Sequence, residues 1–171
     1  MLEQLLRTHV ASDDREEADR VAMLRLVAEL EQPTSRDQAR AHFTASAFVI
    51  DAGCARTCLV EHAKLGRLLQ PGGHIEPADE SVEAAALREA TEETRLELDF
   101  HPSAPRPFDL DIHQIPERPG EPAHFHLDIR YLLVGRGDPC DGAAWYPIDH
   151  PVEESVARLA RKARALSSRA E

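Results

Sequence analysis

The spacing of apolar residues changes near residue 40, from a helical period to the alternation of strands. Before that point, apolar residues form two helical stripes, made of Leu2, Leu5, Leu6 and Val10 and of Val21, Leu24, Val27 and Ala28. Asp13 is followed three residues later by Glu16, a pair typical of a helix N-terminus, and Pro33 would end the second helix. We therefore expect residues 1–40 to form a helical extension that serves as a packing surface, a lid or a dimer contact.

From residue 41 onward the pattern alternates strands with helices. Strands are predicted at 43–51, 56–64, 68–73, 96–101, 108–115, 124–134 and 143–149, and helices at 81–94 and 152–168. Such interleaving predicts an α/β fold, with a mixed sheet between helical layers. The last helix would pack through its apolar stripe, and its basic residues are expected on a solvated face, namely Arg158, Arg161, Lys162 and Arg164. We expect residues 41–171 to form one domain.

Composition and charge narrow the classes of partner. A chain of 171 residues with 42% hydrophobic residues suits one compact domain with a small extension. The net charge of −11 argues against a nucleic-acid-binding surface, because phosphate backbones attract an excess of lysine and arginine. No apolar run approaches the roughly 18 residues of a membrane span, and the N-terminus lacks a secretory pattern. Three cysteines without a CxxC pair are typical of a reducing compartment, so we expect a cytoplasmic protein.

The segment GGHIEPADESVEAAALREATEETRL, residues 72–96, concentrates acidic side chains on one predicted helix. Glu89, Glu92 and Glu93 stand at i, i+3 and i+4, which is one helical face. Like charges at this spacing repel by tenths of a kcal/mol per exposed pair. A solvated face or a bound divalent cation would each offset the repulsion, since Mg²⁺ prefers carboxylate oxygens and bridges to phosphates. The spacing leaves both interpretations open.

The same segment resembles the Nudix box, whose usual form is G-x5-E-x7-R-E-U-x-E-E-x-G-U, with U a bulky apolar residue. The matching residues, preceded by Pro71-Gly72, are Gly73, Glu80, Arg88, Glu89, Ala90, Glu92, Glu93 and Leu96. Two positions depart from the pattern. Six residues instead of five follow Gly73, which leaves open whether Asp79 or Glu80 orients the arginine, and Arg95 stands where the helix usually ends in glycine.

The resemblance implies a Nudix-type α/β/α sandwich and the hydrolysis of a diphosphate linkage in a nucleoside diphosphate joined to another group. Glu89, Glu92, Glu93 and the carbonyl of Gly73 or its neighbour would bind Mg²⁺ or Mn²⁺. Arg88 would pair with Glu80. The catalytic residues would be Arg88, Glu80, Glu92 and Glu93. The substrate would be a small nucleotide-type molecule, and Nudix proteins are often homodimers.

The general base stays open between a glutamate of the box and the proline-rich loop at residues 116–122. That loop offers Glu117 and Glu121, and its prolines suit a lid over a substrate. A plain surface connection is the alternative.

Alternating polar residues in the strand HFHLDIRY suggest a second chemical feature. His124, His126 and Asp128 face the same way, while Phe125 and the other odd positions would turn to the core. Two histidines at this spacing can ligate zinc or iron, can line a substrate pocket, or can make structural polar contacts. We favour the pocket wall and add His74, next to the box, as a further substrate-binding candidate.

Two other functions fit the same fold. Isopentenyl-diphosphate isomerase has a similar Gly-His pair, found here as Gly73-His74, but it carries a cysteine just before that pair, where this chain has Gly72. A non-catalytic nucleotide-binding module would typically lose glutamates of the box, which this chain keeps. Hydrolysis is therefore the favoured prediction.

Overall fold

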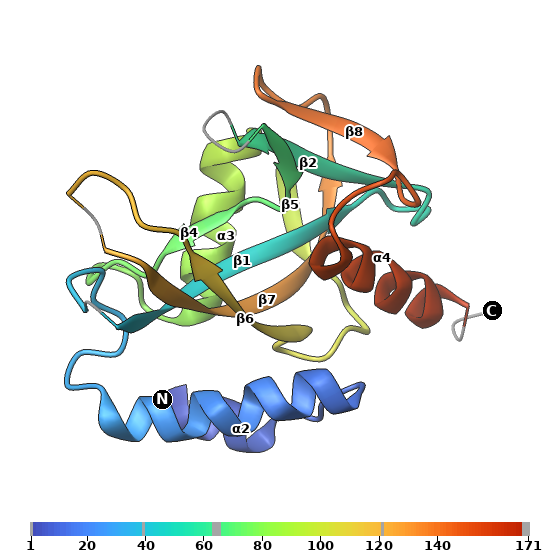
Figure 1. Cartoon of the computed structure of the whole chain (residues 1–171). Helices are drawn as coiled ribbons and strands as arrows, with labels where there is room; N and C mark the ends of the chain where they lie inside the picture. The colour runs from blue at the N-terminus through green and yellow to red at the C-terminus, as the bar shows by residue number, and fades with distance from the viewer. Residues whose placement is uncertain (1, 39, 63–65, 121, 169–171) are drawn as a thin grey trace.

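The computed structural model describes residues 2–38, 40–62, 66–120 and 122–168. Its helices and strands follow the order predicted from the sequence, except that the single strand expected at 68–73 is two short strands, at 67–69 and 72–74 (Figure 1). The elements, in chain order, are α1 (Leu2–Thr8), α2 (Asp14–Glu29), β1 (Ala41–Ile50), β2 (Arg56–His62), β3 (Arg67–Leu69), β4 (Gly72–His74), α3 (Val82–Thr94), β5 (Glu97–Phe100), β6 (Asp109–Ile115), β7 (His124–Arg136), β8 (Ala143–Pro147) and α4 (Glu154–Ser167).

The strands form one mixed sheet of eight strands. Its main path runs β3-β2-β1-β7-β5, while β4 pairs with β1, β6 with β7 and β8 with β2. The long central strands β1 and β7 are parallel, and the other pairings are antiparallel. Because β4 and β6 pair with these two strands at the same end of the sheet, they bring the glycine turn and the histidine-rich strand close together.

Alternation along β1 decides what each face of the sheet carries. Phe43 and Ala45 pack with α3, whereas Phe48 and Ile50, on the opposite face, pack with α4. Earlier along β1, the same second face carries the buried polar residues His42, Thr44 and Ser46. The predicted α/β/α arrangement is thus confirmed (Figure 1). One part of one face of the sheet is polar instead of apolar.

Local signals set the helix ends as the sequence predicts. The carboxylate of Asp13 accepts a hydrogen bond from the backbone N–H of Glu16 at 2.8 Å, and Ser81 caps α3 in the same way. At the other end of α3, Arg95 adopts a left-handed conformation with φ of 58°, and its N–H donates to the carbonyl of Thr91. An arginine therefore occupies the backbone conformation usually given to glycine, at a cost of about 1 kcal/mol.

A buried ionic cluster attaches the N-terminal helices to the rest of the fold. The side chain of Glu16 is fully buried, and each of its oxygens lies 3.0 Å from the amine of Lys162 on α4. His9 lies 2.7 Å from the same carboxylate. Burial alone would raise the pKa of Glu16, but hydrogen bonds from His9 and Ser12, together with the charge of Lys162, lower it. The extension is therefore held by a charged contact as well as by apolar packing.

The same cluster corrects the expectation for α4. Arg158 is only 4% exposed, and it donates to Asp109 at 2.7 Å, while Lys162 donates to the other oxygen of Asp109 at 2.9 Å. The prediction that both basic residues lie on a solvated face is wrong. Their partners come from β6 and α2, which the helical period of α4 does not reveal.

Two smaller expectations have different outcomes. The three cysteines are all free thiols, as expected from their spacing. Phe125 was expected in the core, but it is 43% exposed near the start of β7. Within the described residues, no helix is long and apolar enough to cross a membrane.

Candidate active site

The acidic face of α3 lies against the glycine turn of β4. The backbone N–H of Gly72 donates to Oε2 of Glu93 at 2.9 Å. At Gly73, an added Cβ would lie 2.7–2.8 Å from the carboxylate of Glu89, closer than real Cβ contacts allow. Glycine at this position is therefore what allows the carboxylate of Glu89 to lie against β4.

Arg88 connects the loop before α3 to the acidic face. Its Nε and Nη2 donate to the two oxygens of Asp79, both at 2.9 Å, and its Nη1 donates to Glu89 at 2.9 Å. Nη2 also donates to the backbone carbonyl of His74 at 2.9 Å. The guanidinium is thus fixed from three directions and holds Glu89 in place.

Asp79, and not Glu80, is the partner of the arginine. The side chain of Asp79 is 6% exposed, whereas Glu80 is exposed on the surface. The predicted pair between Arg88 and Glu80 is wrong. Five residues separate Gly73 from Asp79, as in the usual box, so the extra residue is Glu80, between Asp79 and the helix. The hydrogen bonds from Arg88 lower the pKa of Asp79, which keeps this carboxylate ionised.

The two inner carboxylates are costly to ionise where they lie. Burial raises the pKa of Glu93, and the neighbouring carboxylates of Glu89 and Glu92 raise it further. Burial also raises the pKa of Glu89, although Arg88 opposes the shift. A divalent cation with oxygen ligands would relieve both costs, so the donor set fits Mg²⁺ or Mn²⁺.

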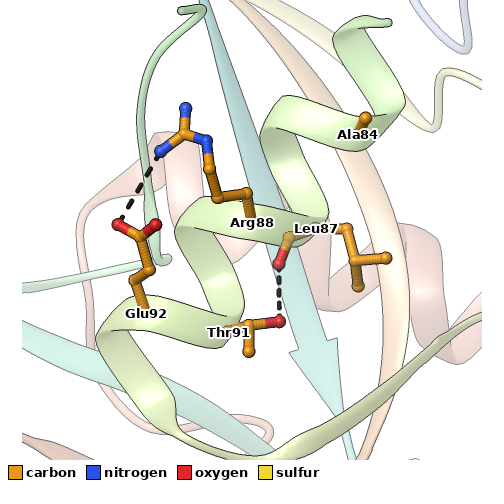
Figure 2. A pocket seen from close by; sticks show the side chains of 5 residues that line it. All are labelled: Ala84, Leu87, Arg88, Thr91 and Glu92. Atoms are coloured by element: carbon orange, nitrogen blue, oxygen red, sulfur yellow. Dashed lines mark hydrogen bonds and ion pairs between the residues drawn. The ribbon is translucent and has the colours of Figure 1, made fainter. Parts of the chain in front are cut away.

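Glu92 occupies the outer side of the same helix. Its side chain is 58% exposed, and its Oε2 lies 3.7 Å from Nη1 of Arg88. Figure 2 shows these two side chains facing each other beside a shallow pocket lined by Ala84, Leu87 and Thr91 as well. The three glutamates of the box are therefore not equivalent, since Glu89 and Glu93 contact β4 while Glu92 borders open solvent.

The predicted histidines converge on the polar face of the sheet. His126 pairs in register with His42 on β1 and with His113 on β6, so the three rings form a row across three strands. His124 lies beside them, with its ring centroid 5.2 Å from that of His126, and His74 on β4 lies 5.1 Å from His42. The sequence pointed to His74, His124 and His126.

His42 and His113 were missed. In the sequence, these histidines stand out only because they alternate with apolar residues in or beside a predicted strand, as His42, Thr44 and Ser46 do. Such alternation does not tell which strands are neighbours in the sheet.

Asp128 lies on the same face but in the interior. It is 3% exposed, and its oxygens accept hydrogen bonds from Thr44 at 3.0 Å, Ser46 at 2.7 Å and Arg130 at 2.9 Å. Burial alone would raise its pKa, but the charge of Arg130 lowers it. This position supports the strands from within and leaves the predicted substrate contact of Asp128 without support. Glu121, one of the candidates for the general base, lies outside the described residues.

Comparison with known families decides the assignment. A family model described as the NUDIX domain matches residues 40–165. The chain belongs to this family. The resemblance of residues 72–96 to the Nudix box is thereby confirmed, and the chain is a Nudix hydrolase, an enzyme class that acts on phosphorus-containing anhydrides. A search of curated proteins finds no match.

Solved structures of other Nudix proteins share the fold. A NUDIX-family hydrolase from Clostridium perfringens is 24% identical, with a TM-score of 0.54, over 73% of this chain and 97% of its own. An Ap4A hydrolase from C. elegans is 17% identical, with a TM-score of 0.53, over 74% and 97% of the two chains. A UDP-X diphosphatase is 16% identical, with a TM-score of 0.52, over 95% and 90%. At these identities the likeness supports the Nudix sandwich and says nothing of substrate.

Proposed function

We propose that this Nudix hydrolase uses Mg²⁺ or Mn²⁺ to cleave a diphosphate linkage in a nucleoside diphosphate joined to another group. The observation that carries the proposal is the placement of Glu89 and Glu93, two carboxylates with raised pKa values held against Gly72 and Gly73. The hydrogen bonds from Arg88 and Gly72 offset only part of the cost of ionising these two groups, and a bound cation would offset the rest.

Each residue of the box has a distinct task in this proposal. Glu89 and Glu93, with Glu92 and the carbonyl of Gly73, would hold the metal, which when bound stabilises the charge on phosphoryl oxygens and acidifies water. Arg88 keeps Glu89 oriented through its 2.9 Å hydrogen bond. The 2.9 Å hydrogen bond from Gly72 orients Glu93 in the same way. Because these carboxylates are already ordered, the reaction does not carry the entropic cost of ordering them.

The attacking water must lose its proton to a base near the diphosphate. Glu92 and Glu93 are the candidates within the box, and Glu92 keeps free access to solvent. Glu117, exposed in the loop after β6, and Glu121 stay predictions for the same task. A base of this kind contributes about 10²–10⁴-fold to the rate. Mutating each candidate in turn should therefore identify the base by the size of the loss in rate.

We further propose that a small nucleotide-type substrate lies along the polar face beside β4. His74 follows Gly73 directly in the chain, and its ring reaches the other histidines through His42. His124 and His126 would then form the wall of the substrate site, as the alternation of β7 predicts.

The proposed division of the chain assigns catalysis to residues 41–171 and a supporting role to residues 1–40. The match of the family model from residue 40 supports this division. The buried contact between Glu16 and Lys162 supports a structural role for the extension. A homodimer formed through these helices remains a prediction.

Product release from a panel of substrates tests the proposal. The panel comprises nucleotide sugars, ADP-ribose, dinucleoside polyphosphates and deoxynucleoside triphosphates, each with Mg²⁺, Mn²⁺ or a chelator. Glu93→Gln should abolish turnover, whereas Glu83→Gln, on the same helix but away from β4, should retain it. Absence of product from every substrate would favour a binding module. Interconversion of isopentenyl and dimethylallyl diphosphate would favour the isomerase.

A further inference from the structure

Five histidines meet on one face of the sheet, apart from the carboxylates of α3. Three of them have ligand nitrogens that all lie within 4.8 Å of one another, namely His42, His124 and His126. These three nitrogens are close enough together to hold one metal ion. His74 and His113 stand at its border, with ring centroids 5.7 Å and 5.5 Å from that of His126.

The backbone fixes the positions of these three rings. His42 and His126 lie directly opposite each other on the paired central strands β1 and β7, and their ring centroids are 4.8 Å apart. His124 stacks on His42 at 5.0 Å. Rings carried by paired strands of a buried sheet hold their spacing better than rings on loops.

The tautomer of His124 is set by a carbonyl group. Its Nδ1 lies 2.9 Å from the carbonyl oxygen of Pro122, which can only accept, so Nδ1 carries the hydrogen. In the neutral ring this leaves the lone pair on Nε2, the nitrogen that can ligate an ion. Histidines that bind metals commonly donate their other ring N–H to a backbone carbonyl or a carboxylate in this way.

We propose that His42, His124 and His126 bind a transition-metal ion of the Zn²⁺, Co²⁺ or Ni²⁺ class. Imidazole nitrogen suits these ions, whereas Mg²⁺ requires oxygen ligands and belongs with the carboxylates of α3. Tetrahedral ligands at about 2.0–2.1 Å from zinc lie about 3.3–3.4 Å apart, so the rings must close in slightly by side-chain rotation. Three protein ligands leave a further position open, typical of sites that also bind water or a substrate oxygen.

The proposed ion would lie next to the Nudix box, residues 72–96. His74 borders the group through its ring, and its carbonyl accepts the hydrogen bond from Arg88. An anionic group of the substrate distant from the diphosphate could reach the open position. The site itself stands on the histidines alone and does not depend on the hydrolytic function proposed above.

Metal binding measured directly tests the proposal. Metal-free protein is titrated with Zn²⁺ in excess Mg²⁺ by calorimetry, and with Co²⁺ by its visible absorption. We expect one site per chain for the wild type and for Glu89→Gln and Glu93→Gln. His42→Gln and His126→Gln should each weaken binding by more than about 100-fold, since even loss of an outer partner costs about 10–100-fold. The matched control is His101→Gln, outside the group, which should bind as the wild type does.

Each outcome is decisive. Loss of binding in both group variants, with far-UV circular dichroism unchanged, supports the site. Binding that is absent in the wild type, or equal in His126→Gln and His101→Gln, overturns it. Binding lost in Glu93→Gln instead would place the ion among the carboxylates and overturn it as well. Should a group variant fail to fold, electron paramagnetic resonance of Cu²⁺ bound to the wild type decides, because imidazole nitrogens give resolved couplings and carboxylates do not.

Discussion

The pairing of Arg88 with Asp79 predicts a large difference between two adjacent acidic residues. Asp79→Ala removes both 2.9 Å hydrogen bonds to the guanidinium and the 2.7 Å bond that the backbone N–H of Glu76 donates to the same carboxylate. Glu80→Ala truncates an exposed side chain one position later. If Glu80 were the partner, as the seven residues between it and Arg88 suggest, the two effects would be reversed.

The burial of the Asp79–Arg88 pair sets the expected loss of stability. Breaking a fully buried pair costs about 3–5 kcal/mol, and an exposed pair contributes about 0–1 kcal/mol. Asp79 is 6% exposed and Arg88 24%, and the arginine keeps its bonds to Glu89 and His74. We therefore expect Asp79→Ala to lower the free energy of unfolding by about 2–3 kcal/mol, or the Tm by about 4–12 °C for a chain of this size. Glu80→Ala should change it by less than about 0.5 kcal/mol.

Thermal unfolding and turnover of the best substrate from the panel are the assays. Asp79→Ala should also lower kcat by about 10²-fold, because Arg88 no longer holds Glu89 in one place. A double-mutant cycle of Asp79→Ala with Arg88→Ala should give a coupling of about 1–3 kcal/mol. A larger loss in Glu80→Ala, or additive effects in the cycle, would refute the assigned partner.

Four further substitutions test other parts of the structure. In metal-free protein, Glu93→Gln should raise the Tm while lowering kcat by orders of magnitude, because it removes a carboxylate that burial makes costly to ionise; a lower Tm would contradict this reasoning. Gly73→Ala should weaken Mg²⁺ binding measured by calorimetry, since its Cβ would lie 2.7 Å from the carboxylate of Glu89. Arg95→Gly should raise the free energy of unfolding in urea by about 0.5–1 kcal/mol, through relief of the left-handed strain. The pKa of Glu16 in the folded protein lies below its unfolded value of 4.5. The stability that Glu16 contributes is therefore present above about pH 4.5 and is lost as the pH falls. In urea unfolding measured at several acid pH values, Glu16→Gln should lose less stability with falling pH than the wild type.

The sequence by itself determined the order of elements and the ends of the helices. Apolar periodicity placed the strands and helices to within a few residues, because burial of one face is a property of the segment alone. Asp13 predicted a helix start, and Arg95 marked a helix end without glycine, because capping involves residues within one turn. The resemblance of residues 72–96 to the Nudix box then supplied the family.

Only the tertiary structure decided which residues meet across the sheet. It selected Asp79 over Glu80, buried Arg158 against β6, and joined His42 to His126 across the pairing of β1 with β7. Each of these contacts joins segments whose closeness depends on strand order, loop path or helix packing. For His42 and His126, a one-residue shift of register would end the pairing, and for the other contacts the loop path or helix packing decides. No local pattern in the sequence can therefore specify them.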